Sequence, residues 1–268
     1  MIRPETGKGT QRQRWVPFFL ACPVFLSISI LVSGCRPYVF DPADSARALA
    51  KAAGWREYVL DATGLGLVGF VNPAPGVRRT ISLRVYIEGD GRAWETQATP
   101  APDPTPDDPV ALKLALADPS PAVAYLARPC QYVRTSAARG CDIRYWTSAR
   151  YGEEVVAATD RAVSELMRLY GAGSTVLVGF SGGGAVAALV AARRTDVARI
   201  VTVAGVLDHA AWTRIHDVTP LRGSLNPADF GARLGDIPQV HFVGARDPIV
   251  PAGVALSYLA RMPQGTRA

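Results

Sequence analysis

The segment GFSGG at positions 179–183 combines a hydroxyl nucleophile with glycines on both sides. This pattern alone is weak evidence, but here it follows an apolar strand-like run, Thr175–Val178, and precedes an alanine- and valine-rich helix-like run, Gly184–Arg194. A serine on a sharp strand-to-helix turn leaves no room for side chains two positions away, which accounts for the glycines. We therefore expect Ser181 to act as a nucleophile and the N–H of Gly182, at the helix N-terminus, to stabilise an oxyanion. The alternative is a glycine-rich turn shaped for packing or phosphate binding, although no Lys-Ser/Thr follows the glycines as in a P-loop.

A serine hydroxyl needs a base, and the base needs an acid that orients it. The segment GARDPIVP, which follows the strand-like run Gln239–Val243, offers Asp247 as that acid. An acid at the carboxyl end of a sheet strand lies on the edge where active sites of α/β proteins assemble. Asp247 is alternatively an ordinary turn residue before Pro248, and Asp208 is then the reserve candidate.

The chain contains three histidines, and all of them precede Asp247 in the sequence. His241 falls within a predicted strand, where a side chain more often packs in the core than reaches a site. His209 and His216 lie in a predicted insertion between two strands, which favours surface or lid positions. The sequence therefore offers no obvious catalytic base.

The elements that must position these residues alternate along the chain. The predicted strands are Trp55–Leu60, Leu65–Val71, Thr80–Glu88, Val123–Ala127, Thr175–Val178, Ala198–Val203 and Gln239–Val243. The predicted helices are Ser45–Gly54, Val110–Ala117, Ala149–Tyr170, Gly184–Arg194 and Pro251–Arg261, and Thr99–Pro109 is a proline-rich loop. Alternating strands and helices predict an α/β fold with a mostly parallel sheet between two helical layers.

In three segments the sequence resembles the α/β-hydrolase superfamily, and most closely the bacterial lipoproteins that carry such a domain. The segments are GFSGGG at 179–184, GARDPIVP at 244–251 and YIEGDG at 86–91. The resemblance implies hydrolysis of an ester, thioester or amide through an acyl-enzyme on Ser181, with no cofactor or metal. It implies that the N–H of Asp90 is the second oxyanion donor, although many members have His-Gly where this chain has Glu88-Gly89.

The same resemblance implies a lid-like insertion over Val206–Pro238 and a three-layer domain over residues 35–268. In the family a last strand and a loop with the catalytic histidine follow the final helix, so we expect this domain to be C-terminally incomplete. The expected consequence is an impaired hydrolase. The alternative is a complete, non-catalytic lipoprotein that binds a ligand in the cell envelope.

The N-terminal 34 residues have the pattern of a secretory signal. Basic residues up to Arg14 precede an apolar stretch, which ends in a small-small-Cys sequence at Cys35. This ending resembles the bacterial lipobox, and it implies acylation of Cys35 and attachment to the membrane by lipid such as palmitate. Since Arg36 is not the aspartate associated with inner-membrane retention, we expect the periplasmic face of the outer membrane. The alternative is an uncleaved membrane anchor with an incidental cysteine.

Export would place the two remaining cysteines of the domain, Cys130 and Cys141, in an oxidising compartment, so a disulfide between them is expected. The alternative is two unpaired cysteines.

Half of the net charge of +6 lies in the predicted signal peptide, since residues 1–34 carry four basic residues and one acidic residue. The mildly basic remainder has no Lys/Arg run that would predict nucleic-acid binding, and its cysteines lack metal-ligand spacing. The substrate and the oligomeric state are left open by the sequence.

Overall fold

The computed structural model of the 268-residue chain describes residues 41–60, 65–72, 82–133 and 140–266. The signal peptide predicted for residues 1–34 and the lipidation site Cys35 lie outside these residues. Within them, no helix is both long and apolar enough to cross a membrane.

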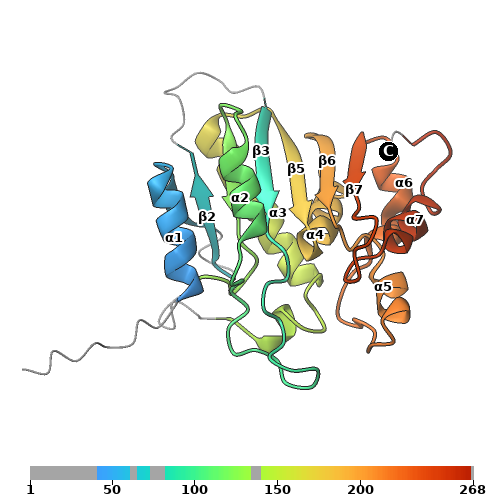
Figure 1. Ribbon diagram of the computed structural model, residues 1–268. Coiled ribbons are helices and arrows are strands. Elements are labelled where there is room, and N and C mark those ends of the chain that lie inside the picture. The colour runs from blue at the N-terminus through green and yellow to red at the C-terminus, as the bar shows by residue number, and fades with distance from the viewer. Residues whose placement is uncertain (1–40, 61–64, 73–81, 134–139, 267–268) are drawn as a thin grey trace, which may run out of the picture. The chain divides into compact units, whose positions relative to one another are not determined.

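Seven strands form a single sheet in the order β1-β2-β4-β3-β5-β6-β7 (Figure 1). The strands are β1 Arg56–Leu60, β2 Leu67–Val71, β3 Ser82–Ile87, β4 Val123–Leu126, β5 Ser174–Phe180, β6 Val197–Val203 and β7 Gln239–Phe242. The β1–β2 and β2–β4 pairs are antiparallel, and the four pairs from β4 to β7 are parallel. The mostly parallel α/β sheet expected from the sequence is therefore confirmed.

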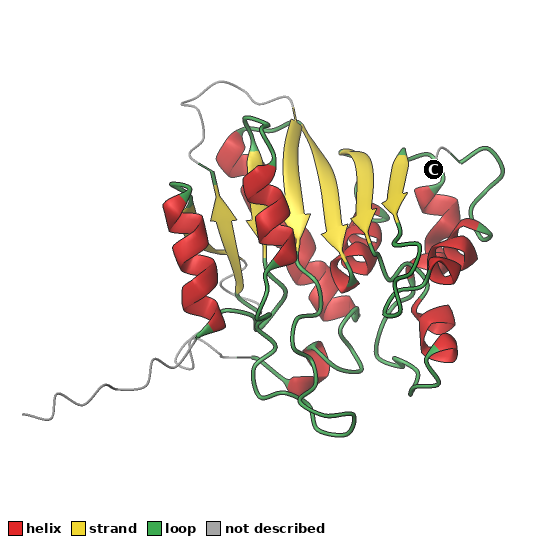
Figure 2. Cartoon of the chain, viewed as in Figure 1, coloured by secondary structure: helices red, strands yellow, loops and turns green. Residues whose placement is uncertain are grey.

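Helices cover the two faces of the sheet and complete three layers (Figure 2). The α-helices are α1 Pro42–Ala52, α2 Val110–Ala117, α3 Glu153–Tyr170, α4 Gly182–Ala191, α5 His209–Ile215, α6 Gly231–Leu234 and α7 Ala252–Leu259, and the 3-10 helices are η1 Ile143–Tyr145 and η2 Pro227–Phe230. One apolar core lies between the sheet and α1 and α2, and a larger one lies on the side of α3, α4 and α7. The sheet needs both cores because its central strands are apolar on both faces.

Helix α3 begins four residues later than the sequence predicted, at Glu153 rather than Ala149. Arg150 and Tyr151 precede the helix, with Gly152 as its N-cap, and their side chains bind Asp90 in the site described below. Helix α4 begins earlier than predicted, at Gly182 rather than Gly184. The helix therefore starts directly after Ser181.

The predicted insertion between β6 and β7 folds into α5, η2 and α6 with connecting loops. Strand β7 is the edge of the sheet, and the side chains of Val240 and Phe242 on it are exposed.

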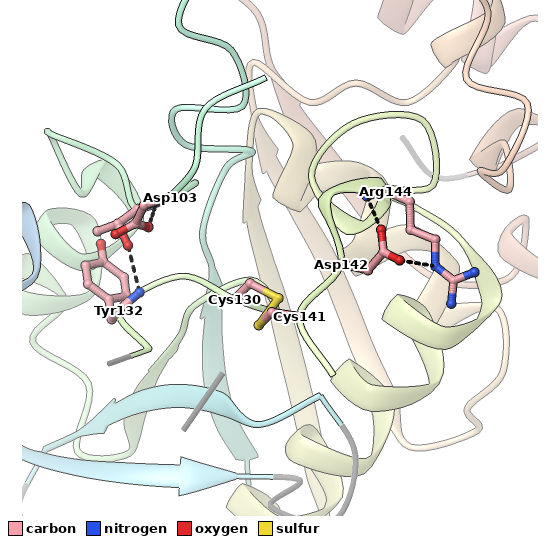
Figure 3. Close-up of a disulfide and its surroundings, with 7 residues drawn as sticks. Asp103, Cys130, Tyr132, Cys141, Asp142 and Arg144 are labelled. Atoms are coloured by element: carbon pink, nitrogen blue, oxygen red, sulfur yellow. Dashed lines mark hydrogen bonds and ion pairs between the residues drawn. A yellow bond between two sulfur atoms is a disulfide. The ribbon is translucent and has the colours of Figure 1, made fainter. Parts of the chain in front are cut away.

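Cys130 and Cys141 form the expected disulfide, with 5.7 Å between their Cα atoms (Figure 3). It fastens the segment after β4 to the segment that leads into η1. Tyr132, two residues after Cys130, donates its N–H to the Thr105 hydroxyl at 2.8 Å. Together these contacts fix the loops that follow the carboxyl end of β4, beside the candidate site.

Candidate active site

Ser181 occupies a sharp turn between β5 and α4. Its backbone has φ 51° and ψ −122°, in the positive-φ region that side-chain-bearing residues rarely adopt. The N–H of Ser181 donates to the carbonyl of Val203 at 2.9 Å, and its carbonyl accepts from Val206 at 3.1 Å and Gly184 at 2.9 Å. The strained turn is thus held by hydrogen bonds to the end of β6, and strain of this kind gathers at functional sites.

The glycines on either side of Ser181 are required by close packing. A Cβ atom on Gly179 would overlap the backbone of Gly183, and a Cβ atom on Gly183 would overlap the carbonyl oxygen of Ile87 in β3. These contacts bring the first turn of α4 directly against the sheet. The spacing of glycines in the sequence therefore reflects a turn too tight for larger residues.

Ser181 lines a cavity of about 510 Å³ at the carboxyl ends of the parallel strands. The lining residues include Glu88, Asp90, Trp94, Arg150, Trp212 and Val250. In the described part of the chain, the backbone N–H groups of Gly182 and Asp90 donate no hydrogen bond to another residue. Asp90 lines the cavity, whereas Gly182 is buried directly after Ser181 at the N-terminus of α4, where the helix dipole favours an anion.

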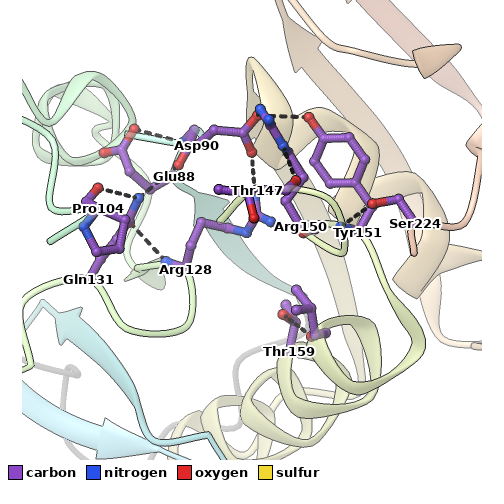
Figure 4. Close-up of polar contacts among 12 residues, drawn as sticks. Glu88, Asp90, Pro104, Arg128, Gln131, Thr147, Arg150, Tyr151, Thr159 and Ser224 are labelled. Carbon is purple, nitrogen blue, oxygen red and sulfur yellow. Dashed lines mark hydrogen bonds and ion pairs between the residues drawn. The ribbon is translucent and has the colours of Figure 1, made fainter. Parts of the chain in front are cut away.

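The Asp90 carboxylate is the centre of a buried charge cluster (Figure 4). Its Oδ1 accepts from Arg128 at 2.9 Å, and its Oδ2 accepts from Arg150 at 3.0 Å and from the Tyr151 hydroxyl at 2.8 Å. The Arg150 guanidinium also donates to the carbonyl of Thr147, and Arg128 also donates to the carbonyl of Arg150. These bonds lock the loop after β3 in place and so fix the position of the Asp90 N–H.

The cluster carries one positive charge in excess, since two guanidinium groups face one carboxylate. Burial by itself would raise the pKa of the Asp90 carboxyl, but the charges of Arg150 and Arg128 and the Tyr151 hydrogen bond outweigh it. The pKa of Asp90 therefore lies below its ordinary value. An excess positive charge in a poorly solvated wall favours a negative charge that develops nearby.

Glu88 lies beneath the same loop and is 1% exposed. Its Oε1 accepts from the N–H of Gly89 at 2.9 Å and of Ala111 at 3.3 Å, at the start of α2, while its buried Oε2 has no partner in the described residues. Burial raises the pKa of Glu88 to about 7, against the lowering effect of those backbone donors.

Asp247 lies in the turn after β7, as expected from the sequence. Its Oδ1 accepts from the N–H of Ile249 at 2.8 Å and of Val250 at 3.0 Å, and Oδ2 has no partner among the described residues. Ile249 and Val250 line the serine cavity, whereas Asp247 itself does not. Asp247 therefore shapes the turn at the edge of the cavity and keeps one oxygen free.

All three histidines are described, and none of them lines the cavity that contains Ser181. His241 in β7 packs on Tyr258 and shares a 2.9 Å hydrogen bond between its Nδ1 and Thr202, and burial lowers its pKa to about 4. Burial also lowers the pKa of His209, whose ring nitrogens have no hydrogen-bond partner in the described residues. His216 bonds through Nε2 to the carbonyl of Ile249 at 2.9 Å.

Asp208, the reserve acid, is fully buried away from the cavity. Its carboxylate accepts from the Ser257 hydroxyl at 2.6 Å, the Asn226 amide at 3.0 Å and the N–H of Ala211 at 3.1 Å. These bonds tie α5 to η2 and α7. The hydrogen-bonding capacity of Asp208 is used within the fold.

The sequence offered Ser181, Gly182 and Asp90 as candidates but did not single out Arg128, Arg150 and Tyr151, which contact Asp90. A signal was present for Arg128, because it follows β4 and charged residues at the carboxyl ends of parallel strands gather on one edge. Arg150 and Tyr151 were hidden because their positions fit the apolar pattern of a longer α3.

No protein-family model matches this sequence. No curated protein matches it by sequence. The structure, however, is similar to that of a putative dienelactone hydrolase from Klebsiella pneumoniae, at 18% identity and a TM-score of 0.52, over 78% of this chain and 79% of that one. It is also similar to an esterase from Pyrococcus furiosus, at 12% identity and a TM-score of 0.52, over 79% and 78% of the two chains.

A third similar structure is the acylaminoacyl peptidase from Pyrococcus horikoshii, at 13% identity and a TM-score of 0.54. The match covers 78% of this chain but 34% of the peptidase, so this chain spans about a third of that protein. At these identities the similarity establishes the fold. The chain has the α/β-hydrolase fold, with a serine at the turn between β5 and α4.

Proposed function

We propose that this protein is a serine hydrolase that cleaves an ester, thioester or amide through an acyl-enzyme on Ser181. The observation that carries the proposal is the setting of Ser181, which stands on a strained strand-to-helix turn and faces a cavity beside two free backbone donors. A nucleophile in this setting has its hydroxyl exposed to substrate and an anion-binding site next to it.

In the proposed reaction, the Ser181 Oγ attacks the carbonyl carbon of the substrate. The carbonyl oxygen becomes negative and accepts hydrogen bonds from the N–H groups of Gly182 and Asp90. The bond to the leaving group then breaks, the leaving group departs with the proton of the serine, and water hydrolyses the acyl-enzyme. The ion pairs of Asp90 with Arg128 and Arg150 support this step because they hold the donor in place before substrate binds.

Asp247 is proposed to be the acid that would orient a base through its free Oδ2, but the described residues offer no histidine in that role. Since no histidine of the described chain lines the cavity, we expect turnover to be several orders of magnitude below that of a complete triad. The remaining catalysis would come from the oxyanion donors and from substrate binding.

A second candidate function is ligand binding without catalysis, as an envelope lipoprotein derived from this fold. The observation that favours it is the position of the histidines, none of which lines the serine cavity. His209 and His216 lie in α5 and at its C-cap, and His241 is half-buried in the edge strand β7. The two functions differ in whether Ser181 is reactive.

Treatment of the full chain with a fluorophosphonate probe distinguishes them. Because no histidine lines the cavity, we expect slow labelling of Ser181 at high probe concentration and long incubation, and no labelling of the variant Ser181→Ala. Ser164→Ala is the matched control, because Ser164 lies on α3 and contacts Asp160 and Arg194 rather than the cavity. Absence of labelling in the wild-type chain, with folding verified by circular dichroism, would favour the binding function.

We further propose that Cys35 carries lipid and anchors the domain to the bacterial envelope at the periplasmic face of the outer membrane. The support is the sequence pattern before Cys35. Metabolic labelling of the expressing bacterium with an alkyne analogue of palmitate, followed by fractionation, tests the proposal. Labelling that persists in Cys35→Ser would contradict it.

A further inference from the structure

A second, larger cavity of about 840 Å³ lies beside the serine cavity. Trp94, Arg150 and Trp212 line both cavities. Because the same three residues line both, the two cavities lie side by side, and together they are called the groove here. The proposed reaction at Ser181 uses only the first part of this groove.

One wall of the second cavity is a two-stranded ribbon after β3. Trp94 pairs with Pro100 in an antiparallel bridge, and Ala101 donates its N–H to the carbonyl of Ala93 at 3.1 Å. The indole N–H of Trp146 donates to the carbonyl of Ala101 at 3.0 Å and fastens the base of the ribbon. Trp94 therefore stands on a held segment, yet its side chain is 42% exposed.

The opposite wall is α5 with the segment that follows it. The indole N–H of Trp212 donates to the carbonyl of Ile249 at 2.7 Å, and His216 binds the same carbonyl at 2.9 Å. The rings of Trp212 and His216 lie 4.9 Å apart. Both side chains are thus fixed to the turn that holds Asp247, so this wall is also formed before a ligand arrives.

The second cavity is also lined by the exposed polar residues Glu95, Gln97 and Asp217. In the described part of the chain their side chains make no hydrogen bond or ion pair with another residue, so these groups are open to a ligand. Arg150 lies at the junction of the two cavities, held by Asp90. The groove therefore combines two large aromatic surfaces with two carboxylates, an amide and a guanidinium.

This combination matches the surface of a sugar ring. A pyranose presents C–H groups on its faces, which pack on indole rings, and hydroxyl groups around its rim, which donate to carboxylates and amides. A purely apolar acyl chain would leave Glu95, Gln97 and Asp217 desolvated without partners, which is costly.

We propose that this second cavity binds the carbohydrate part of the substrate, so that the protein acts on an acyl ester of a saccharide. The proposal rests on the proposed function of Ser181. The Oγ forms a bond to the acyl carbon, the bond from that carbon to the sugar oxygen breaks, and the sugar oxygen takes the proton of the serine. Water then releases the acyl group as a carboxylic acid.

The test is calorimetric titration of the full-length Ser181→Ala chain with xylotetraose and, separately, with chitotetraose. We expect saturable binding of at least one of them, with a dissociation constant on the order of 1 mM or lower. Trp94→Ala in the same background should weaken that binding at least tenfold, and so should Gln97→Ala, which removes an exposed side chain from the tip of the ribbon. Trp55→Ala is the matched control, because Trp55 packs beside α1 and lines neither cavity.

The proposal is overturned if neither oligosaccharide binds. It is also overturned if Trp94→Ala and Gln97→Ala bind the oligosaccharide as tightly as the Ser181→Ala chain with an unchanged groove. Fluorophosphonate labelling of Ser181 is scored separately. Labelling without saccharide binding would contradict the proposed carbohydrate subsite and support the proposed hydrolase. Saccharide binding without labelling would support the subsite and contradict the hydrolase.

Discussion

The carboxylate of Asp90 lies directly over the backbone of Gly182, so closely that a Cβ atom on Gly182 would overlap it. The two residues that are proposed to donate to the oxyanion are therefore packed against each other, although they are 92 positions apart in the chain. Residue 182 must be a glycine because the loop after β3 places the Asp90 carboxylate where a Cβ atom of residue 182 would lie.

We expect Gly182→Ala to push Asp90 away from Arg128 and Arg150 and to lower both stability and the rate of fluorophosphonate labelling. The loss of stability should be about 2–3 kcal/mol, as for other steric insertions into packed sites. Gly253→Ala is the control, because a Cβ atom there meets nothing closer than 3.8 Å and alanine favours the helix α7. Thermal unfolding and labelling kinetics measure both effects, and a Gly182→Ala chain as stable as wild type would contradict the packing argument.

Asp90→Ala should destabilise the chain by about 3–5 kcal/mol, because two buried guanidinium groups lose their counter-charge. The matched surface change is Glu57→Ala, which removes a partly exposed ion pair with Arg47 at 2.9 Å and should cost at most about 1 kcal/mol. Urea unfolding of both variants gives the comparison. Similar small losses in the two would show that the Asp90 cluster contributes no more than a surface pair.

Glu88→Gln should change the pH dependence of stability. Because the folded-state pKa of Glu88 is raised to about 7 from 4.5, the folded chain binds the proton more tightly, and this contribution to stability is lost as pH rises through 7. Between pH 5 and 8 the wild-type chain should lose on the order of 2 kcal/mol that the glutamine variant retains. Unfolding measured at both pH values tests this, and parallel pH profiles for the two chains would refute it.

Reduction of the Cys130–Cys141 disulfide should lower the free energy of unfolding by about 3 kcal/mol, as expected for a closed loop of this length. Urea unfolding with and without dithiothreitol measures the loss. The double variant Cys130→Ser/Cys141→Ser should be as weak as the reduced chain and should not respond to the reductant. A reductant effect of equal size in that variant would assign the loss to another cause.

Much of the fold was predictable because it depends on local patterns in the sequence. The β5 strand, the glycine-rich turn and the alanine-rich α4 follow one another in the sequence, so the position of Ser181 needed no tertiary information. Asp247 was predictable as a turn residue for the same reason, since its hydrogen bonds reach only two and three residues ahead. Contacts between residues far apart in the chain could not be predicted from the sequence. The start of α3 was therefore placed too early, at residues whose side chains contact Asp90.

The sequence by itself determined the strand–turn–helix around Ser181, the order of strands and helices and the candidate donors Gly182 and Asp90. These depend on hydrophobic periodicity and on glycine, which act over a few residues. Only the tertiary structure decided that Arg128, Arg150 and Tyr151 converge on Asp90, that the histidines lie elsewhere and that Trp94 and Trp212 face one groove. Such contacts join residues far apart in the chain, and their geometry is fixed by the sheet order and the paths of the loops rather than by any local pattern.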